Sequence, residues 1–480
     1  MPQMSFDNLF RKGGRHMKII TSYNIPILQQ ARVTEDNPCV YGKVDDRLMA
    51  VCSACCLDAL KYCVDVFLTE WDYLAAFPTT AKPGKPHRKR IADTLIHSTK
   101  DNQAKYPEFD RRFLNMPAGV RRALIADALG VVSSYRSNHD NWEKTPADER
   151  GEEPSIGYPT RYELTFYKSE RGIDELPDGA IRLKLYNGTS WEWYRFRMKP
   201  SDARYIHALS QTRSMMSPVV IKKNGKFFLR FSFEEKQELV DDSNPLNYLV
   251  MAVDLGINAA ASWCVMDKVG TVFGKGVIHL PNEEGRLNHA INRKRQYQQA
   301  GKKSHCVYRW VDQANERLSI ETTRKLMEVA ALYNVDCIVF EHLDTSGRKK
   351  GGRYRERIHL WRAKDVQKRV ELQAHRNSMR ISRVCAWGTS RYAYDGSGVT
   401  DRKSVYRWVH GEKKYNYSIC TFQNGKIYNC DLSAAQNIGA RFFLREYAKC
   451  EDCPKIPKTP QRTMKTLWDL VRVYKGCQAA

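Results

Sequence analysis

Two short apolar runs, each ending in a carboxylate, constrain most strongly how this chain can fold. The first is "LVMAVD", which ends in Asp254, and the second is "CIVFE", which ends in Glu341. Runs of four or more buried-type residues are typical of strands that are covered on both faces. Charged helical patterns separate the two runs. Strands that alternate with helices predict an α/β layer architecture for this half of the chain.

A third carboxylate, Asp431, stands in "YNCDLSAAQNIGAR", just ahead of small residues that predict the first turns of a helix. Functional groups of an open α/β sheet gather at the carboxyl edge of its strands, so we expect Asp254, Glu341 and Asp431 to converge there. Carboxylates are preferred ligands of Mg²⁺ and Mn²⁺. Two such ions about 3.5–4 Å apart can activate a water and stabilise the leaving oxygen in phosphodiester hydrolysis. We therefore predict that these three residues are both catalytic and metal-binding.

Each carboxylate also has a purely structural interpretation. Asp254 lies two residues before Gly256 and could serve only to shape a turn. Glu341 could form an ion pair with a nearby arginine. Asp431 is compatible with an ordinary helix N-cap. The shared strand-end context of the first two residues and the small-residue helix after the third favour the metal site.

The charge of the chain favours a polyanionic partner. Lys and Arg number 78 against 54 Asp and Glu, a net charge of +24 that is spread along the sequence. Such a field favours nucleic acid over membrane, with a generally basic protein as the alternative. No apolar stretch approaches the roughly 20 residues of a membrane span. The amino terminus lacks the apolar core of a secretory signal. The 14 cysteines are best interpreted as reduced thiols of a cytoplasmic protein.

The first 240 residues predict a different organisation. Residues 18–28 are β-branched and predict a strand, and residues 45–141 have helical periodicity. Residues 155–239 alternate polar and apolar side chains and end in a hairpin with Asn224–Gly225 at its tip. We expect these strands to form a small β-barrel that the first strand completes. The helical block is then an insertion within the barrel.

Three motifs resemble a known nuclease family. "AVDLGINAAAS", "IVFEHLD" and "CDLSAAQNIGAR" resemble, in order and separation, the three motifs of the RuvC domain of TnpB proteins and type V CRISPR effectors. The hairpin and linker before "AVDLG" are similar to the barrel-to-nuclease junction of those proteins. The resemblance covers most of residues 18–441. It is specific in the nuclease motifs and looser in the first 240 residues.

The resemblance implies a multidomain α+β fold. It places an N-terminal segment with the first barrel strand at residues 1–44, a helical recognition domain at 45–150 and a wedge β-barrel at 151–240. An α/β RNase H-like RuvC nuclease domain follows in two parts, residues 241–388 and, with the C-terminal tail, 429–480. A degenerate zinc-ribbon-like, nucleic-acid-binding insertion at 389–428 separates these parts.

The insertion departs from the family pattern, which has two Cys-x-x-Cys pairs. Thr389 and Ser390 are kept, but the four thiol positions hold Ala393, Gly396, Thr421 and Asn424. Nearby Cys420 and Cys430 lack the spacing for tetrahedral coordination. We expect no zinc and an insertion held together by packing of its aromatic residues.

Two other Cys-x-x-Cys pairs and two basic segments need an interpretation. Cys52 and Cys55 lie in an apolar helical pattern and predict core thiols, while Cys450 and Cys453 are at most half of a metal site. The segment 346–369, basic with interleaved aromatics, is either a solvated surface or a mobile lid that contacts a single strand. The segment 292–303 is interpreted as tracking a nucleic-acid backbone.

The resemblance implies an RNA-guided DNA endonuclease, either a compact type V effector or a TnpB-like intermediate. A guide RNA would pair with one strand of target double-stranded DNA, and the protein would read only a short adjacent duplex motif. Mg²⁺ or Mn²⁺ would be the cofactor, and a monomer is favoured over a dimer. Alternatives are an unguided RuvC-type nuclease, a transposon-associated DNA-processing protein, a nuclease-dead guided binder and a non-enzymatic RNA-binding protein.

Overall fold

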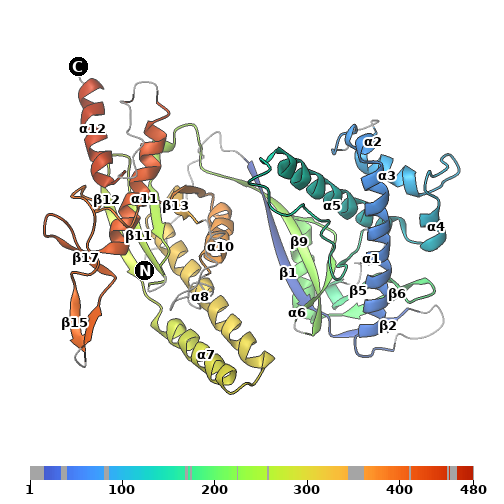
Figure 1. Cartoon of the computed structure of the whole chain (residues 1–480). Coiled ribbons are helices and arrows are strands. Elements are labelled where there is room, and N and C mark those ends of the chain that lie inside the picture. The colour runs from blue at the N-terminus through green and yellow to red at the C-terminus, as the bar shows by residue number, and fades with distance from the viewer. Residues whose placement is uncertain are drawn as a thin grey trace. The chain divides into compact units, whose positions relative to one another are not determined.

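The computed structural model divides into two compact units, Ile20–Glu235 and Lys236–Ala480 with Met1–Ile19 (Figure 1). The residues that the structure describes are 16–33, 40–80, 86–167, 171–172, 176–223, 225–256, 259–343, 362–409, 412–450, 453 and 462–478. Both units mix helices and strands, and each is considered by itself.

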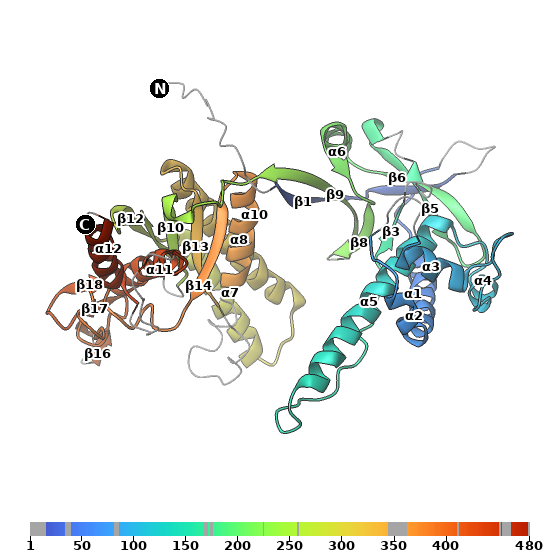
Figure 2. The same cartoon turned by 90° about the horizontal axis from the view of Figure 1, so that it is seen from above.

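The first unit contains two sheets rather than the expected barrel (Figure 2). One sheet has the order β1 (His16–Pro26), β9 (Lys226–Glu238), β8 (Val219–Lys223) and β3 (Leu164–Thr165), with β7 (Ser214–Met215) paired to β9. The other has the order β2 (Gln29–Arg32), β6 (Trp191–Arg197), β5 (Ala180–Tyr186) and β4 (Arg171–Gly172). The first predicted strand therefore does join the terminal hairpin, but the strands described do not close into one ring.

The chain crosses between the two sheets at residues 26–28. Pro26 has no amide hydrogen to donate to a ladder, and β1 ends there. The Ile27 amide donates to the carbonyl of Phe227 at 3.0 Å, and the Leu28 amide to that of Arg197 at 2.8 Å. A segment predicted as one strand is thus divided between two sheets.

The predicted hairpin is confirmed. Lys223 of β8 pairs with Lys226 of β9, which leaves a two-residue turn. Gly225 has a φ of +76°, a left-handed conformation that glycine adopts without steric cost. Its neighbour Asn224 lies outside the described residues.

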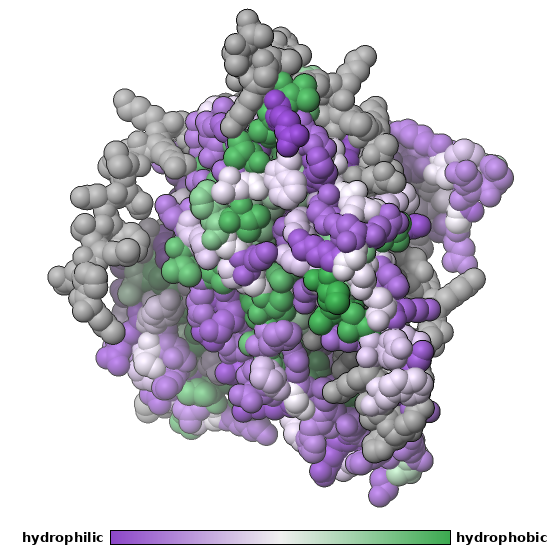
Figure 3. Space-filling view, turned by 90° about the vertical axis from the view of Figure 1, so that its left-hand side faces the viewer, coloured by the Kyte–Doolittle hydropathy of each residue, from purple (hydrophilic) through white to green (hydrophobic). Residues whose placement is uncertain are grey.

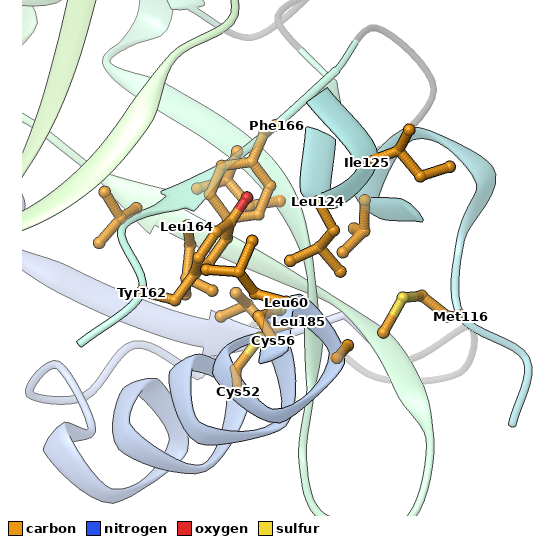
Figure 4. Close-up of a cluster of buried hydrophobic side chains, with 14 of the residues drawn as sticks. Cys52, Cys56, Leu60, Met116, Leu124, Ile125, Tyr162, Leu164, Phe166 and Leu185 are labelled. Carbon is orange, nitrogen blue, oxygen red and sulfur yellow. The ribbon is translucent and has the colours of Figure 1, made fainter. Parts of the chain in front are cut away.

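The helical block of the first unit is confirmed. Its helices are α1 (Asp46–Thr69), α2 (Trp71–Ala75), α3 (Arg88–Ile96), α4 (Glu108–Arg112) and α5 (Ala118–Lys144), and α6 (Pro200–Thr212) lies among the strands. The side chain of Asp45 caps α1 by accepting from the amides of Arg47 and Leu48. Cys52 and Cys56 of α1 are each 1% exposed and lie in one apolar cluster with Leu164 and Leu185 (Figure 4). The interpretation of Cys52 as a core thiol is correct.

The second unit is built on one mixed sheet. Its order is β12 (Val272–Ile278), β11 (Ala261–Met266), β10 (Val250–Asp254), β13 (Cys337–His342) and β14 (Arg380–Cys385). The first two pairings are antiparallel and the last two parallel. The two apolar runs are therefore strands, as predicted, and they lie side by side.

Helices cover both faces of this sheet. Val250 and Ala252 belong to a core with α11 (Cys430–Tyr447) and α12 (Met464–Gln478). Met251 and Val253 belong to another with α8 (His305–Leu332) and α10 (Ala363–Arg376). The alternation follows the two-residue period of a strand. It explains why both runs are apolar at every position.

A further helix and two short turns lie outside these layers. Helix α7 (Pro281–Gln299) packs on α8 through Ala290, Ile291 and Val311. Short 3-10 turns occupy Leu176–Asp178 and Pro245–Asn247.

Among the described residues no helix has the length and apolarity to cross a membrane. The face drawn in Figure 3 is mainly hydrophilic, with hydrophobic residues in small separate patches.

The insertion between β14 and α11 forms two hairpins. They pair β15 (Tyr406–Val409) with β16 (Glu412–Tyr415) and β17 (Ile419–Thr421) with β18 (Ile427–Asn429). Ala393, Cys420, Phe422 and Cys430 form a separate apolar core, with Tyr394 and Tyr428 packed against it. Packing of apolar and aromatic residues therefore holds this ribbon, as predicted. Its lack of zinc stays a prediction.

Candidate active site

Parallel pairing brings Asp254 and Glu341 to adjacent strand ends. Val250 pairs with Cys337, and Val253 with Phe340, so the next positions of β10 and β13 are the two carboxylates. Neighbouring strands are about 4.8 Å apart. By the two-residue period, both residues also fall on the α11 side of the sheet. Strand register therefore places them together.

Asp431 reaches the same edge from α11. Asn429, not Asp431, caps this helix: its Oδ1 accepts from the amides of Asp431 at 2.9 Å and Leu432 at 3.0 Å. The structure thus removes the interpretation of Asp431 as the cap. Its place in the first turn suits a carboxylate, because the helix dipole is positive there.

Helix α11 packs very closely on the sheet. A Cβ added to Gly439 would lie 2.6 Å from Met266 Sδ and 3.2 Å from Ala252 Cβ. Only a glycine lets the helix approach β10 this closely without displacing a neighbour. The close approach keeps the first turn of α11, with Asp431, at the end of β10.

Asp254 and its two partner carboxylates interact electrostatically. Asp254 is 8% exposed, and burial, followed by the charges of Glu341 and Asp431, raises its pKa well above the usual value. Burial also raises the pKa of Glu341 and of Asp431. A buried carboxylate that two neighbouring carboxylates repel in a poorly solvated site favours a bound cation.

Two arginines oppose this accumulation of negative charge. Burial dominates, but the charge of Arg402 in the ribbon offsets part of the rise in the pKa of both Asp254 and Asp431. Arg441 of α11 does the same for the pKa of Glu341. The cluster therefore carries three carboxylates against two guanidinium groups. The charge of Arg441 is thus a trace, among the described residues, of the structural alternative in which Glu341 partners an arginine.

Helix α11 also fixes the segment that follows β14. Arg441 donates to the carbonyls of Cys385 at 2.7 Å and Trp387 at 2.8 Å. Asn437 donates to the carbonyls of Thr389 at 2.9 Å and Tyr392 at 2.8 Å.

Thr389 connects this fixed segment to the carboxylate cluster. Its hydroxyl donates a hydrogen bond to the Glu341 carboxylate, which offsets part of the rise that burial causes in the pKa of that group. In the sequence, Thr389 stands out only as part of the ribbon motif. It contacts a site residue.

Ser262 is a site neighbour that the sequence did not indicate. It lies opposite Asp254 in the antiparallel pairing of β10 and β11, and directly opposite residues project on the same face. Among the described residues, its Oγ is buried and has no hydrogen-bond partner. Since buried hydroxyls are normally paired, this atom points to a ligand or water beside Asp254. A lone serine in an apolar strand carries no periodic signal.

The donor set fits divalent metal ions. Three carboxylates and an unpaired hydroxyl are hard oxygen ligands of the kind that Mg²⁺ and Mn²⁺ prefer. Among the described residues, three ligand-type groups with donor atoms all within 4.8 Å of one another occur at His139, Asp140 and Glu143 of α5. The carboxylates of the cluster are more widely spaced. The chemistry of the three carboxylates, each of which offers oxygen ligands, is what suits them to such ions.

Two further predicted features are the basic segment 346–369 and the cysteine pair in the C-terminal tail. Most of the basic segment 346–369 lies outside the described residues. Of the cysteine pair in the tail, both Cys450 and Cys453 are half-buried, and the described residues place no third ligand-type group with them.

Comparison of the sequence with known proteins gives two findings. The Aq_aa04 family matches residues 43–187, from just before α1 to the end of β5. No curated protein matches the sequence.

The chain is also similar to several solved structures. One is the Cas12f1–sgRNA–target DNA complex, at 10% identity and a TM-score of 0.46, over 87% of this chain and 99% of that one. CasPhi-2 (Cas12j) bound to crRNA and phosphorothioate-DNA is similar at 9% identity and a TM-score of 0.41, over 90% and 91%. The AacC2c1–sgRNA binary complex is similar at 10% identity and a TM-score of 0.32, over 80% and 68%. These structures are type V effector complexes.

Proposed function

We propose that this chain is an RNA-guided, metal-dependent DNA endonuclease, either a compact type V effector or a TnpB-like intermediate. The observation that carries the proposal is the convergence of Asp254, Glu341 and Asp431 at one edge of a mixed sheet, where burial and the charges of the other two raise the Asp254 pKa. Strongly shifted groups of this kind cluster at functional sites. The RuvC assignment of this unit and the domain boundaries given above belong to the same proposal.

The three carboxylates would hold Mg²⁺ or Mn²⁺, with the Ser262 hydroxyl beside Asp254. Bound ions would supply an activated water and charge stabilisation at the phosphate being cut. The protein fixes the ligands: strand register sets Asp254 and Glu341, α11 sets Asp431, and the Thr389 hydroxyl orients Glu341. Such outer contacts hold ligating groups in the geometry that catalysis needs.

Arg402 is suited to contact the substrate backbone. Its Nη2 donates to the carbonyl of Ser390 at 3.0 Å, and its charge acts on Asp254 and Asp431. It lines an open pocket of about 480 Å³ together with Arg391 and Lys403. A guanidinium in this position attracts a phosphate to the carboxylates and neutralises charge that develops on it.

The guided part of the proposal rests on other features. The three sequence motifs resemble those of guided nucleases, and the net charge of +24 favours a large polyanion. An unguided nuclease has no need of the two sheets and helical block of Ile20–Glu235. These residues are proposed to bind the guide scaffold and the short duplex motif next to the target.

The active site is tested with three size-matched variants, Asp254→Asn, Glu341→Gln and Asp431→Asn. Each is expected to lower DNA cleavage in Mg²⁺ by at least about 100-fold. Each removes a repelling charge, so the metal-free variants should melt at or above the wild-type temperature. This combination separates loss of chemistry from loss of folding. Full cutting by any one of the three would refute its assigned role.

The guide is tested by sequencing the RNA that copurifies with the protein expressed with its flanking DNA. We expect one RNA with a constant folded part and a variable end, and the variable end names the target for a cleavage assay. Heterogeneous cellular RNA alone would refute guiding. An unguided RuvC-type nuclease would then be the better description.

A further inference from the structure

The hydroxyl of Tyr428 joins three elements of the second unit: the sheet, the ribbon and helix α11. Tyr428 lies in β18. Its oxygen accepts hydrogen bonds from Lys275 Nζ of β12 and from Gln436 Nε2 of α11, both at 2.9 Å. Lys275 Nζ also lies 5.3 Å from the centroid of the Tyr428 ring. We refer to these three residues as the tyrosine tie.

Packing explains the ring of Tyr428 but not its hydroxyl. The ring packs against the core of the ribbon, with its centroid 5.1 Å from that of Tyr394 and 5.7 Å from that of Phe422. A phenylalanine ring would make the same apolar contacts. The hydroxyl adds the hydrogen bonds to Lys275 and Gln436. It is therefore a group that connects the ribbon to the sheet and to the helix.

Lys275 stands in a row of the sheet that leads to the metal ligands. It pairs with Cys264 of β11, which pairs with Ala252 of β10, and directly opposite residues project on the same face. Cys264 and Ala252 belong to the core that α11 covers, so Lys275 projects on the α11 side as well. Ala252 precedes Asp254 by two residues and shares its face by the strand period. The tyrosine tie therefore begins on the sheet that fixes Asp254.

The other end of the tyrosine tie is close to Asp431. Tyr428 precedes Asp431 by three residues, which span at most about 11 Å even when fully extended. Strand β18 has only 3 residues, and a two-stranded hairpin is marginally stable by itself. Contacts with the sheet and the helix therefore help to fix the point at which the chain enters α11. This point matters for chemistry, because a displacement of about 1 Å in a reacting group can cost about 100-fold in rate.

We propose that the Tyr428 hydroxyl is a positioning group that holds Asp431 in place for metal binding with Asp254, through its hydrogen bonds to Lys275 and Gln436. It acts through Asp431 and is a positioning residue rather than a catalytic one. The metal site that it serves rests on the proposed function. The tyrosine tie itself rests on the contacts among β12, β18 and α11.

Binding of Mn²⁺ to the full-length protein tests the proposal without DNA and without cutting. The electron paramagnetic resonance of free Mn²⁺ gives the affinity, and the binding that Asp254→Asn loses defines the site compared. Tyr428→Phe keeps the ring and should weaken this binding by about 10-fold, the lower end of the range for contacts outside the ligands. Lys275→Met removes the charge of an exposed side chain and should weaken binding less, since the bond from Gln436 remains. Tyr417→Phe, the same change at a 47% exposed tyrosine of the ribbon, should stay within about twofold.

A double variant shows whether the two side chains act through one contact. If Lys275 acts through Tyr428, the variant that carries both Lys275→Met and Tyr428→Phe should bind Mn²⁺ as Tyr428→Phe alone does. Three results would overturn the proposal. They are wild-type affinity of Tyr428→Phe, equal losses for Tyr428→Phe and Tyr417→Phe, and a loss in the double variant equal to the product of the two single losses.

Hydrogen–deuterium exchange of the metal-free protein separates positioning from general destabilisation. Amides of residues 429–436 should exchange faster in Tyr428→Phe and in Lys275→Met, while those of β10 and β13 keep the wild-type rate. Equal acceleration over the whole unit would mean that the variants only weaken the fold, and it would overturn the proposal. Unchanged exchange at residues 429–436 would overturn it as well.

Failure of the tyrosine tie and failure of the proposed function give different results. If Asp254→Asn loses Mn²⁺ binding and cleavage while Tyr428→Phe keeps both, the tie fails and the function stands. If Asp254→Asn binds Mn²⁺ and cuts as wild type does, the proposed function fails. Faster exchange at residues 429–436 in Tyr428→Phe would then still show that the tie holds the start of α11.

Discussion

Replacement of Asn437 by leucine tests whether α11 organises the active site. Asn437 is 0% exposed. Its Nδ2 donates to the carbonyls of Thr389 and Tyr392, and its Oδ1 accepts from the Met464 amide at 3.2 Å. Leucine is of similar size but leaves all three backbone groups unpaired, at about 1–3 kcal/mol each. The expected destabilisation is therefore at least about 3 kcal/mol.

Thermal melting measures this loss. In a unit of this size, about 1 kcal/mol corresponds to about 2–4 °C, so Asn437→Leu should melt about 6–12 °C below wild type. Asn288→Leu, the same change at an exposed position of α7, is the matched control and should stay within about 2 °C. At temperatures below the melting range, DNA cleavage by Asn437→Leu should also be slower than that of wild type, because Thr389 then no longer holds Glu341. A melting temperature of Asn437→Leu within about 2 °C of wild type would refute the reasoning.

Three further outcomes follow from the same structure. Ser262→Ala removes a buried hydroxyl without a partner, so the metal-free protein should melt about 2–4 °C higher. An unchanged or lower melting temperature would show that the hydroxyl is hydrogen-bonded. Burial raises the pKa of Asp127, so the folded state binds the proton more tightly than the unfolded chain, and the ionised group destabilises the fold at neutral pH. Asp127→Asn should therefore melt at a higher temperature than wild type near pH 8 but not near pH 4, where the aspartate is largely protonated. The same increase in melting temperature at both pH values would contradict the raised pKa of Asp127. Finally, since apolar packing holds the ribbon, phenanthroline should leave melting unchanged and elemental analysis should find no zinc. A lower melting temperature with the chelator would show a structural metal.

The sequence was most informative where local pattern and tertiary position coincide. Two apolar runs with carboxylates at their ends predicted β10 and β13, because a strand covered on both faces must be apolar at every position. The small residues after Asp431 predicted α11, and Gly439 shows why they are small. Strand register then brings the carboxylates together, as the α/β pattern implied.

The rest depended on long-range pairing that no local pattern contains. Pro26 marks the end of a strand in the sequence. The sheet that the next residues join is determined by hydrogen bonds to Phe227 and Arg197, about 170–200 residues away in the chain. Ser262 joins the site only through its register with Asp254. Asn429 caps α11. Several residues near the start of this helix are of types that can cap a helix, so the sequence alone did not identify which of them does.

Anomalous diffraction from crystals soaked in Mn²⁺ tests the central claim most directly. We predict one or two strong peaks within ligand distance of the Asp254, Glu341 and Asp431 carboxylates, about 2–2.2 Å for oxygen ligands of small divalent ions. The peaks should disappear in Asp254→Asn crystals soaked in the same way. Manganese bound elsewhere, with none at the three carboxylates, would contradict the assignment of this site as the metal centre.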